Sequence, residues 1–109
     1  MPSGACPWQS GAVLYVVVYA VAEGGSEQIA EVYPRHLEYL TEFARSGQVV
    51  LIGPMLPAPA SWSMAVFRSQ EAAETFPQGD PFVLEGLAVP SAVREWQALE
   101  FPPPPPARG

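Results

Sequence analysis

The stretch VLYVVVYA, residues 13–20, decides the fold of this 109-residue chain. Apolar side chains occupy both alternating sets of positions, so neither face of the predicted strand is suited to water. The run is too short to cross a bilayer as a helix. A chain of this length has enough helix to cover only one face of a sheet, and a second copy of the sheet is the simplest cover for the other face. The stretch therefore predicts a buried strand in a homodimer.

The composition limits the chain to one small domain with few kinds of partner. Hydrophobic residues make up 49% of the sequence, which is enough for a single core. A net charge of −6 without a basic stripe disfavours nucleic acid as a partner. Cys6 is the only cysteine, so an intrachain disulfide and a thiolate metal cluster are both excluded, and a cytoplasmic setting fits best. No secretory signal or membrane span is expected.

Three segments have distinct compositions. Residues 1–11 are rich in glycine, proline and serine, and residues 102–109 carry a run of five prolines. Such compositions are typical of mobile or extended tails. We expect one domain at residues 12–101 between two tails.

Helical spacing of apolar residues follows the first strand. It covers residues 27–46, with Pro34 expected to break or restart the helix and Gly47 expected to end it. A strand is then predicted at residues 49–52 and another at residues 62–68.

The second half of the chain repeats this pattern in a shorter form. Ser69 is expected to cap a helix at residues 70–76, which the segment 77–81 then breaks. A turn of helix near residues 82–86 and a final strand at residues 89–101 complete the order β-α-β-β-α-β. This order predicts an α+β, ferredoxin-like fold with a mostly antiparallel sheet and helices on one face.

One histidine, His36, and one aspartate, Asp80, are the first candidates for acid–base chemistry. At 100° per residue His36 falls on the apolar face of its helix, between Val32 and Leu40. A carboxylate bonded to one imidazole nitrogen would make the other nitrogen a general base. The alternative is a core histidine bonded to a backbone carbonyl, with Asp80 capping the turn at Pro81.

These motifs resemble the YciI-like (YCII-related domain) family of the dimeric α/β-barrel superfamily. The resemblance rests on the opening strand at residues 15–17, PRHLEYL at residues 34–40, the stretch from Gly47 to Met55, and GDPF at residues 79–82 followed by Gly86.

The resemblance implies that His36 and Asp80 form a His–Asp dyad, with Ser61 near it. One characterised member is a dehydrochlorinase of a chlorinated hydroxyquinol, which implies small aromatic or polyketide-derived substrates. The family usually carries an arginine three residues before the histidine, where this chain has Tyr33, with Arg35 displaced next to His36.

The sequence thus predicts a small enzyme that performs an elimination, isomerisation or cyclisation on a small molecule without a cofactor. His36 and Asp80 are the predicted catalytic residues, and the predicted substrate contacts are Tyr33, Arg35, Ser61 and Phe82. No metal is expected, because a single histidine without a cysteine pair leaves only scattered carboxylates. No phosphate-binding glycine loop is present, and the chain has no lysine for a Schiff base. The alternative function is a non-catalytic module that binds a small molecule or a partner.

Overall fold

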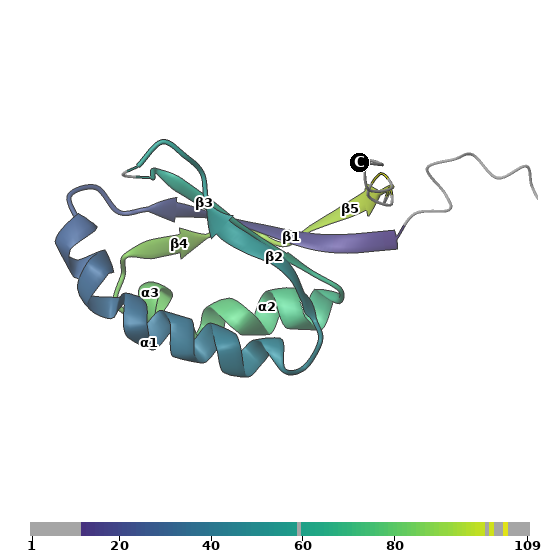
Figure 1. The fold of residues 1–109 in the computed structure, drawn as a ribbon, viewed down its shortest axis with the longest axis horizontal. Coiled ribbons are helices and arrows are strands. Elements are labelled where there is room, and N and C mark those ends of the chain that lie inside the picture. The colour runs from purple at the N-terminus through teal and green to yellow at the C-terminus, as the bar shows by residue number, and fades with distance from the viewer. Residues whose placement is uncertain (1–11, 59, 100, 102–103, 105–109) are drawn as a thin grey trace, which may run out of the picture.

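A computed structural model describes residues 12–58, 60–99, 101 and 104 of the chain (Figure 1). The expected N-terminal tail, residues 1–11, and the expected C-terminal tail, except Pro104, lie outside the described residues. In chain order the elements are β1 (Ala12–Val21), α1 (Ser26–Ala44), β2 (Val49–Pro54), β3 (Trp62–Phe67), α2 (Gln70–Gly79), α3 (Pro81–Leu84), β4 (Ala88–Pro90) and β5 (Arg94–Ala98).

The strands form one antiparallel sheet in the order β2-β3-β1-β4, and β5 also pairs with β1. Figure 1 shows the helices together on one side of this sheet, so the described chain has two layers. The α+β, ferredoxin-like prediction is confirmed. β1 lies at the centre, with β3 along one edge and β4 and β5 along the other.

The core lies between the sheet and the helices. Alternate residues of β1 face it, and Val17 and Tyr19 are buried there beside Phe67 of β3 and Phe76 of α2. Burial of side chains of this size is the main source of stability in a small domain. The described helices are all too short or too polar to span a membrane.

The prediction that Pro34 breaks the first helix is wrong. α1 runs without interruption from Ser26 to Ala44, and Pro34 lies on its exposed side. Proline removes one N–H from the helix ladder, but a carbonyl freed on an exposed face can bond to water. Gly47, which has a φ of +78°, follows the helix end as predicted.

The second helix also continues through a proline. α2 extends to Gly79 rather than ending at Phe76. Phe76 and Pro77 are both buried, and their packing outweighs the one hydrogen bond that the missing N–H of Pro77 removes. At its other end, Ser69 Oγ accepts a hydrogen bond from the Ala72 N–H at 3.1 Å, as predicted for an N-cap.

The predicted final strand, residues 89–101, is two short strands instead of one. β4 and β5 pair in succession with the same edge of β1, and Ser91 lies between them. The Ser91 side chain takes part in the ladder, because its Oγ accepts the Val18 N–H at 3.0 Å while its own N–H donates to the Val18 carbonyl at 2.8 Å. A serine hydroxyl thus replaces a strand carbonyl where the ladder breaks after Pro90.

Candidate active site

His36 lies on the inner side of α1, as the helical spacing predicted. It is 9% exposed, one turn after the buried Val32. A polar ring in this position needs a hydrogen-bond partner, because an unpaired buried polar group costs about 1–3 kcal/mol. The partner comes from a segment that is 44 positions away in the chain.

Asp80 is that partner, and it lies at the junction of α2 and α3. It is 3% exposed, and it is at once the C-cap of α2 and the N-cap of α3. Its Oδ1 accepts the Phe82 N–H at 3.1 Å. An N-cap aspartate followed by a proline at the first helical position is a common start for a helix, so the predicted capping role of Asp80 is present.

His36 Nδ1 and Asp80 Oδ1 are 2.8 Å apart, and both side chains are buried. The two roles that the sequence left as alternatives for Asp80, capping and pairing with histidine, therefore occur together on one oxygen. An ionised carboxylate can only accept, so Nδ1 carries a hydrogen and Nε2 is free to take a proton when the ring is neutral. The same contact excludes the alternative in which His36 bonds only to a backbone carbonyl.

The imidazole is held on one face by the residue that follows the Asp-Pro pair. The rings of His36 and Phe82 stack with their centroids 4.2 Å apart and their planes 18° from parallel. On α1 itself, the exposed Tyr33 ring is 6.1 Å from the imidazole and tilted by 36°. Asp80 and Phe82, two positions apart, thus fix His36 by a hydrogen bond and by stacking.

Tyr39 and Gly79 support this junction, although the sequence did not single either of them out for that purpose. The Tyr39 hydroxyl donates to the Phe76 carbonyl at 2.8 Å and so ties α1 to the last turn of α2. A Cβ on Gly79 would lie 2.7 Å from the Tyr39 hydroxyl oxygen. Tyr39 follows His36 by three positions, a spacing that places the two on neighbouring parts of the helix surface.

Two tyrosines near the dyad are affected by the Asp80 charge. Burial, and then the negative charge of Asp80, raise the pKa of the Tyr19 hydroxyl far above its ordinary value of 10. The same two causes, in the same order, raise the pKa of Tyr39. Both phenols therefore stay protonated at neutral pH and can serve as hydrogen-bond donors.

Arg35 and Ser61, two of the predicted substrate contacts, lie at the surface. Arg35 points away from the core, and its Nη2 is 3.6 Å from Oε2 of Glu85 in an exposed ion pair. Ser61 is exposed at the start of β3, where its carbonyl accepts the Val21 N–H. Among the residues that the structure describes, no hydrogen bond joins either side chain to His36 or Asp80.

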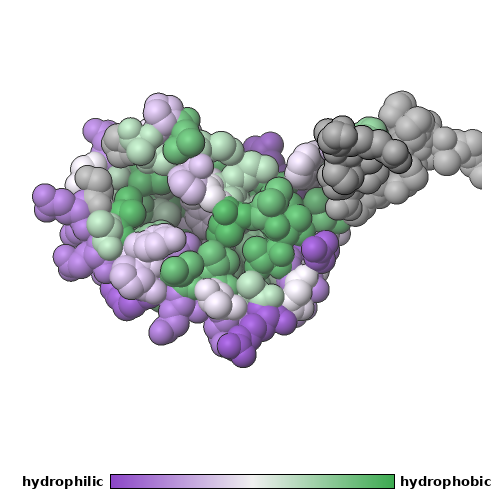
Figure 2. Space-filling model, viewed as in Figure 1, coloured by the Kyte–Doolittle hydropathy of each residue, from purple (hydrophilic) through white to green (hydrophobic). Residues whose placement is uncertain are grey.

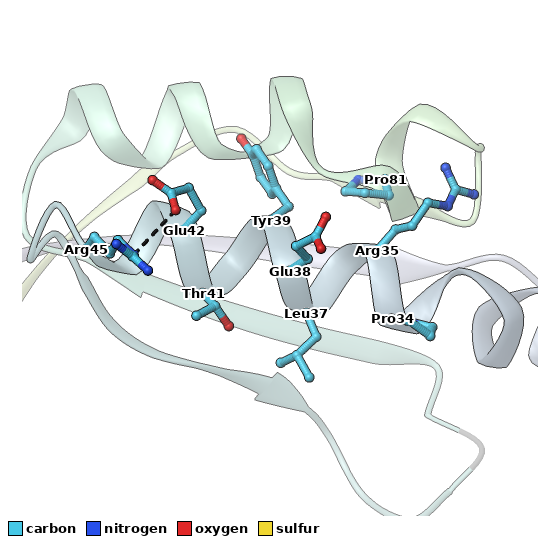
Figure 3. Close-up of a pocket in the computed structure, with 9 residues that line it drawn as sticks. All are labelled: Pro34, Arg35, Leu37, Glu38, Tyr39, Thr41, Glu42, Arg45 and Pro81. Carbon is cyan, nitrogen blue, oxygen red and sulfur yellow. Dashed lines mark ion pairs between the residues drawn. The ribbon is translucent and has the colours of Figure 1, made fainter.

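A wide, open groove follows the outer side of α1 beside the dyad (Figure 3). Arg35 and Pro81, the chain neighbours of His36 and Asp80, line it, but the two dyad residues do not. Its full lining is Pro34, Arg35, Leu37, Glu38, Tyr39, Thr41, Glu42, Arg45 and Pro81. A second groove, between α2 and the segment that joins β4 to β5, also leaves the dyad out. Within the described part of the chain, no three His, Cys, Asp or Glu side chains are grouped so as to hold a metal ion.

The fold is shared with a solved structure of 5-chloro-2-hydroxyhydroquinone dehydrochlorinase (TftG) from Burkholderia phenoliruptrix AC1100 in complex with 2,5-dihydroxybenzoquinone. The TM-score is 0.62 at 23% sequence identity, over 76% of this chain and 92% of that chain. No curated protein matches the sequence. The sequence pattern of the YCII-related domain matches residues 13–97, which is most of the chain. The chain therefore belongs to the YCII-related domain family.

Proposed function

We propose that this protein is a small acid–base enzyme in which His36 removes a proton from a small, hydroxylated aromatic substrate and Asp80 orients the imidazole. The observation that carries the proposal is the buried 2.8 Å contact between His36 Nδ1 and Asp80 Oδ1. A carboxylate on Nδ1 fixes the tautomer with Nε2 free, and that nitrogen is the one able to accept a proton.

The substrate class is suggested by the neighbouring fold. The Burkholderia protein is a dehydrochlorinase with a dihydroxybenzoquinone bound, so this architecture accommodates an oxygen-substituted ring. In an elimination from such a ring, one hydroxyl first ketonises as its proton moves to the carbon that bears the halogen. The base then takes the proton of a second hydroxyl, the electron pair moves through the ring to that carbon, and the halide leaves it with the bonding pair, so that a quinone and the hydrogen halide are formed. The protein has to supply a base and a partly dry site for this step, and the chain has both in a buried His–Asp pair.

The proposed substrate contacts have different support. Phe82 stacks on the imidazole, which supports a role in holding the base. Tyr33 is exposed on the same helix as His36 and is near its ring, so a bound aromatic molecule beside the base would meet it. Arg35 is already paired with Glu85, and Ser61 lies just before the start of β3, so these two have the weaker support.

A non-catalytic binding module is the second candidate function. The observation that favours it is that neither groove described above includes His36 or Asp80. In that case the dyad would serve only to join α1 to the junction of α2 and α3.

We further propose that residues 12–101 form a single domain that works as a homodimer, with the sheet face opposite the helices as the contact surface. Its support is the row of exposed apolar side chains on that face, which includes Leu51, Trp62 and Trp96.

The experiment is a turnover assay with 5-chloro-2-hydroxyhydroquinone and a panel of halogenated hydroquinones, following chloride release. We expect turnover by the wild-type protein and a loss of about 100-fold or more in kcat for His36→Ala and His36→Gln, the usual contribution of a general base. Asp80→Asn keeps a capping oxygen and is expected to lose activity as well. Glu31→Gln, an exposed change on the same helix, is the matched control and should retain full activity.

Binding measured by calorimetry separates the two candidate functions. A His36→Gln variant that binds the compound but does not turn it over supports the enzyme. Full activity of His36→Gln would remove His36 from the mechanism. Wild-type protein that binds a panel member without any turnover would favour the binding module.

A further inference from the structure

Tyr39 is a polar residue on the same helix as His36 that the proposed mechanism does not use. It follows His36 by three positions on α1, which is about 4.5 Å along the helix axis. Its side chain reaches from α1 toward α2 (Figure 3), and its hydroxyl donates to the Phe76 carbonyl at 2.8 Å. Among the residues that the structure describes, this is the only hydrogen bond between α1 and α2. The polar connection between the two helices therefore depends on one phenol.

The Tyr39 hydroxyl contacts the part of α2 that leads directly into Asp80. Its acceptor, Phe76, lies in the last turn of α2, four positions before Asp80. The hydroxyl and the ring also pack so closely over Gly79 that no Cβ fits between them. Asp80 follows Gly79 as the C-cap of α2. The phenol thus contacts the end of α2 twice, at a carbonyl and at the glycine that is bonded to Asp80.

Ring packing holds this hydroxyl in place. The rings of Tyr39 and Phe76 have their centroids 5.0 Å apart and their planes tilted by 40°, and the ring of Phe43 lies 6.0 Å from Tyr39 on the same helix. The phenol keeps its hydrogen at neutral pH, because burial and then the charge of Asp80 raise its pKa. The contact is therefore a fixed donor on α1 and a fixed acceptor on α2.

The dyad depends on this separation of the helices, because His36 is on α1 and Asp80 ends α2. Their contact is 2.8 Å long, and an N–H···O bond spans about 2.7–3.2 Å, so a shift of about 1 Å would break it. Oδ1 of Asp80 also accepts the Phe82 N–H, and that bond can persist when the imidazole is lost. A neutral imidazole released from the carboxylate can carry its hydrogen on either nitrogen.

We infer that Tyr39 is a positioning residue for the dyad, whose hydrogen bond to the Phe76 carbonyl holds Asp80 at the distance that keeps the His36 hydrogen on Nδ1 and leaves Nε2 free. The inference rests on the proposed role of the dyad, but its test observes the imidazole directly and needs no substrate. Its failure can therefore be told apart from failure of the proposed function.

The test is 15N NMR spectroscopy of the His36 ring in the labelled full chain, freed of any tag, at a pH where the ring is neutral. His36 is the only histidine, so its two ring nitrogens give unambiguous signals, and their positions report which nitrogen carries the hydrogen. Tyr39→Phe removes one oxygen and keeps the ring that packs against Phe76. We expect it to move the Nδ1 resonance toward that of a nitrogen without a hydrogen, and the Nε2 resonance in the opposite direction.

Two control variants separate positioning from stability. Ser69→Ala removes the hydrogen bond to the Ala72 N–H at the other end of α2, so it should lower the urea midpoint of unfolding without moving either resonance. Tyr15→Phe makes the same chemical change on β1, against the same core, and should also leave both resonances in place. Unmoved resonances in Tyr39→Phe, or an equal movement in either control, would assign Tyr39 to stability alone and overturn the inference. A wild-type Nδ1 without a hydrogen would instead contradict the dyad, and with it both proposals.

Discussion

At position 79, a hydrogen in place of a methyl group leaves room for the ring of Tyr39. A Cβ there would come within 2.7 Å of the Tyr39 hydroxyl oxygen and 2.9 Å of ring carbon Cε1. Contacts this close force one group to move, and Tyr39 is held by its hydrogen bond to the Phe76 carbonyl. Gly79 therefore matters for packing next to Asp80, and its φ is not in the left-handed region.

Gly79→Ala is expected to lower the free energy of unfolding by about 1–3 kcal/mol, the usual cost of an overpacked site. Urea unfolding provides the measurement. The matched control is Gly53→Ala on β2, where a new Cβ meets nothing within 4 Å, and its change should stay within about 0.5 kcal/mol. A second change, Tyr39→Leu, removes the clashing atoms and should make Gly79→Ala less costly. Equal costs for the two glycine variants would show that Tyr39 moves aside freely.

The raised pKa of Tyr19 has a consequence for stability at alkaline pH. In the unfolded chain a tyrosine loses its proton near pH 10, whereas burial and the Asp80 charge keep Tyr19 protonated in the folded protein. Above pH 10 the unfolded state therefore binds fewer protons, and the free energy of unfolding falls as the pH rises.

We expect this fall to reach about 1.4 kcal/mol per pH unit from Tyr19 alone, and to be absent below pH 10. Tyr19→Phe should make the alkaline fall shallower, with a remaining part from Tyr39, whose pKa is raised as well. The measurement is a series of urea unfolding curves between pH 8 and 12 for the wild type and Tyr19→Phe. Parallel curves would contradict the prediction.

At the scale of the elements, the sequence predicted type and order better than ends. Helical spacing identified α1 and the inward direction of His36, and the Ser69 cap marked the start of α2. Both errors in the helices came from treating proline as a stop signal. Pro34 and Pro77 each remove a single hydrogen bond, and the packing of the rest of the helix outweighs that loss.

The prediction of a single final strand was wrong for a related reason. The interrupted alternation at residues 89–101 predicts a strand, but this pattern does not show that a side-chain hydroxyl, Ser91 Oγ, will replace a backbone acceptor in the middle of the segment. Local pattern gives propensity, whereas the pairing partner of each residue is set by the whole sheet.

The sequence predicted part of the candidate site. His36 and Asp80 were singled out by their rarity and by the motifs around them, and the structure brings them together. The support from Tyr39 and Gly79 depends on which groups of α1 and α2 meet. No spacing along the chain encodes that meeting.

At the scale of the whole molecule, the feature to explain is the sheet face opposite the helices. Because Val17 and Tyr19 point into the core, the alternate residues of β1, such as Leu14 and Ala20, point to the other face. The pairing register places Trp96 opposite Leu14, and both Trp62 and Val89 opposite Ala20, on this same face.

Several of these side chains are exposed. Figure 2 shows apolar side chains gathered over the strands, while polar ones follow the helical edge of the molecule. On the sheet face the large exposed apolar residues are Leu51, Trp62, Val89 and Trp96. Exposed apolar side chains of this size on one sheet face are typical of an interface, and two sheets packed face to face are a common solution.

The homodimer prediction is tested by making the same substitution, Leu→Glu, at two different positions. Leu51 on the sheet face is 65% exposed and Leu84 on α3 is 67% exposed, so Leu→Glu at either position adds the same charge to a side chain of nearly equal exposure. If the sheets pack together, Leu51→Glu buries an unpaired carboxylate at the interface and shifts the protein to monomer, because such a charge is costly out of water. Leu84→Glu leaves the interface untouched and should remain a dimer. Sedimentation velocity of the full chain at micromolar concentration gives the mass directly. A wild-type monomer, or equal dissociation by both variants, would show that the apolar sheet face does not join two copies.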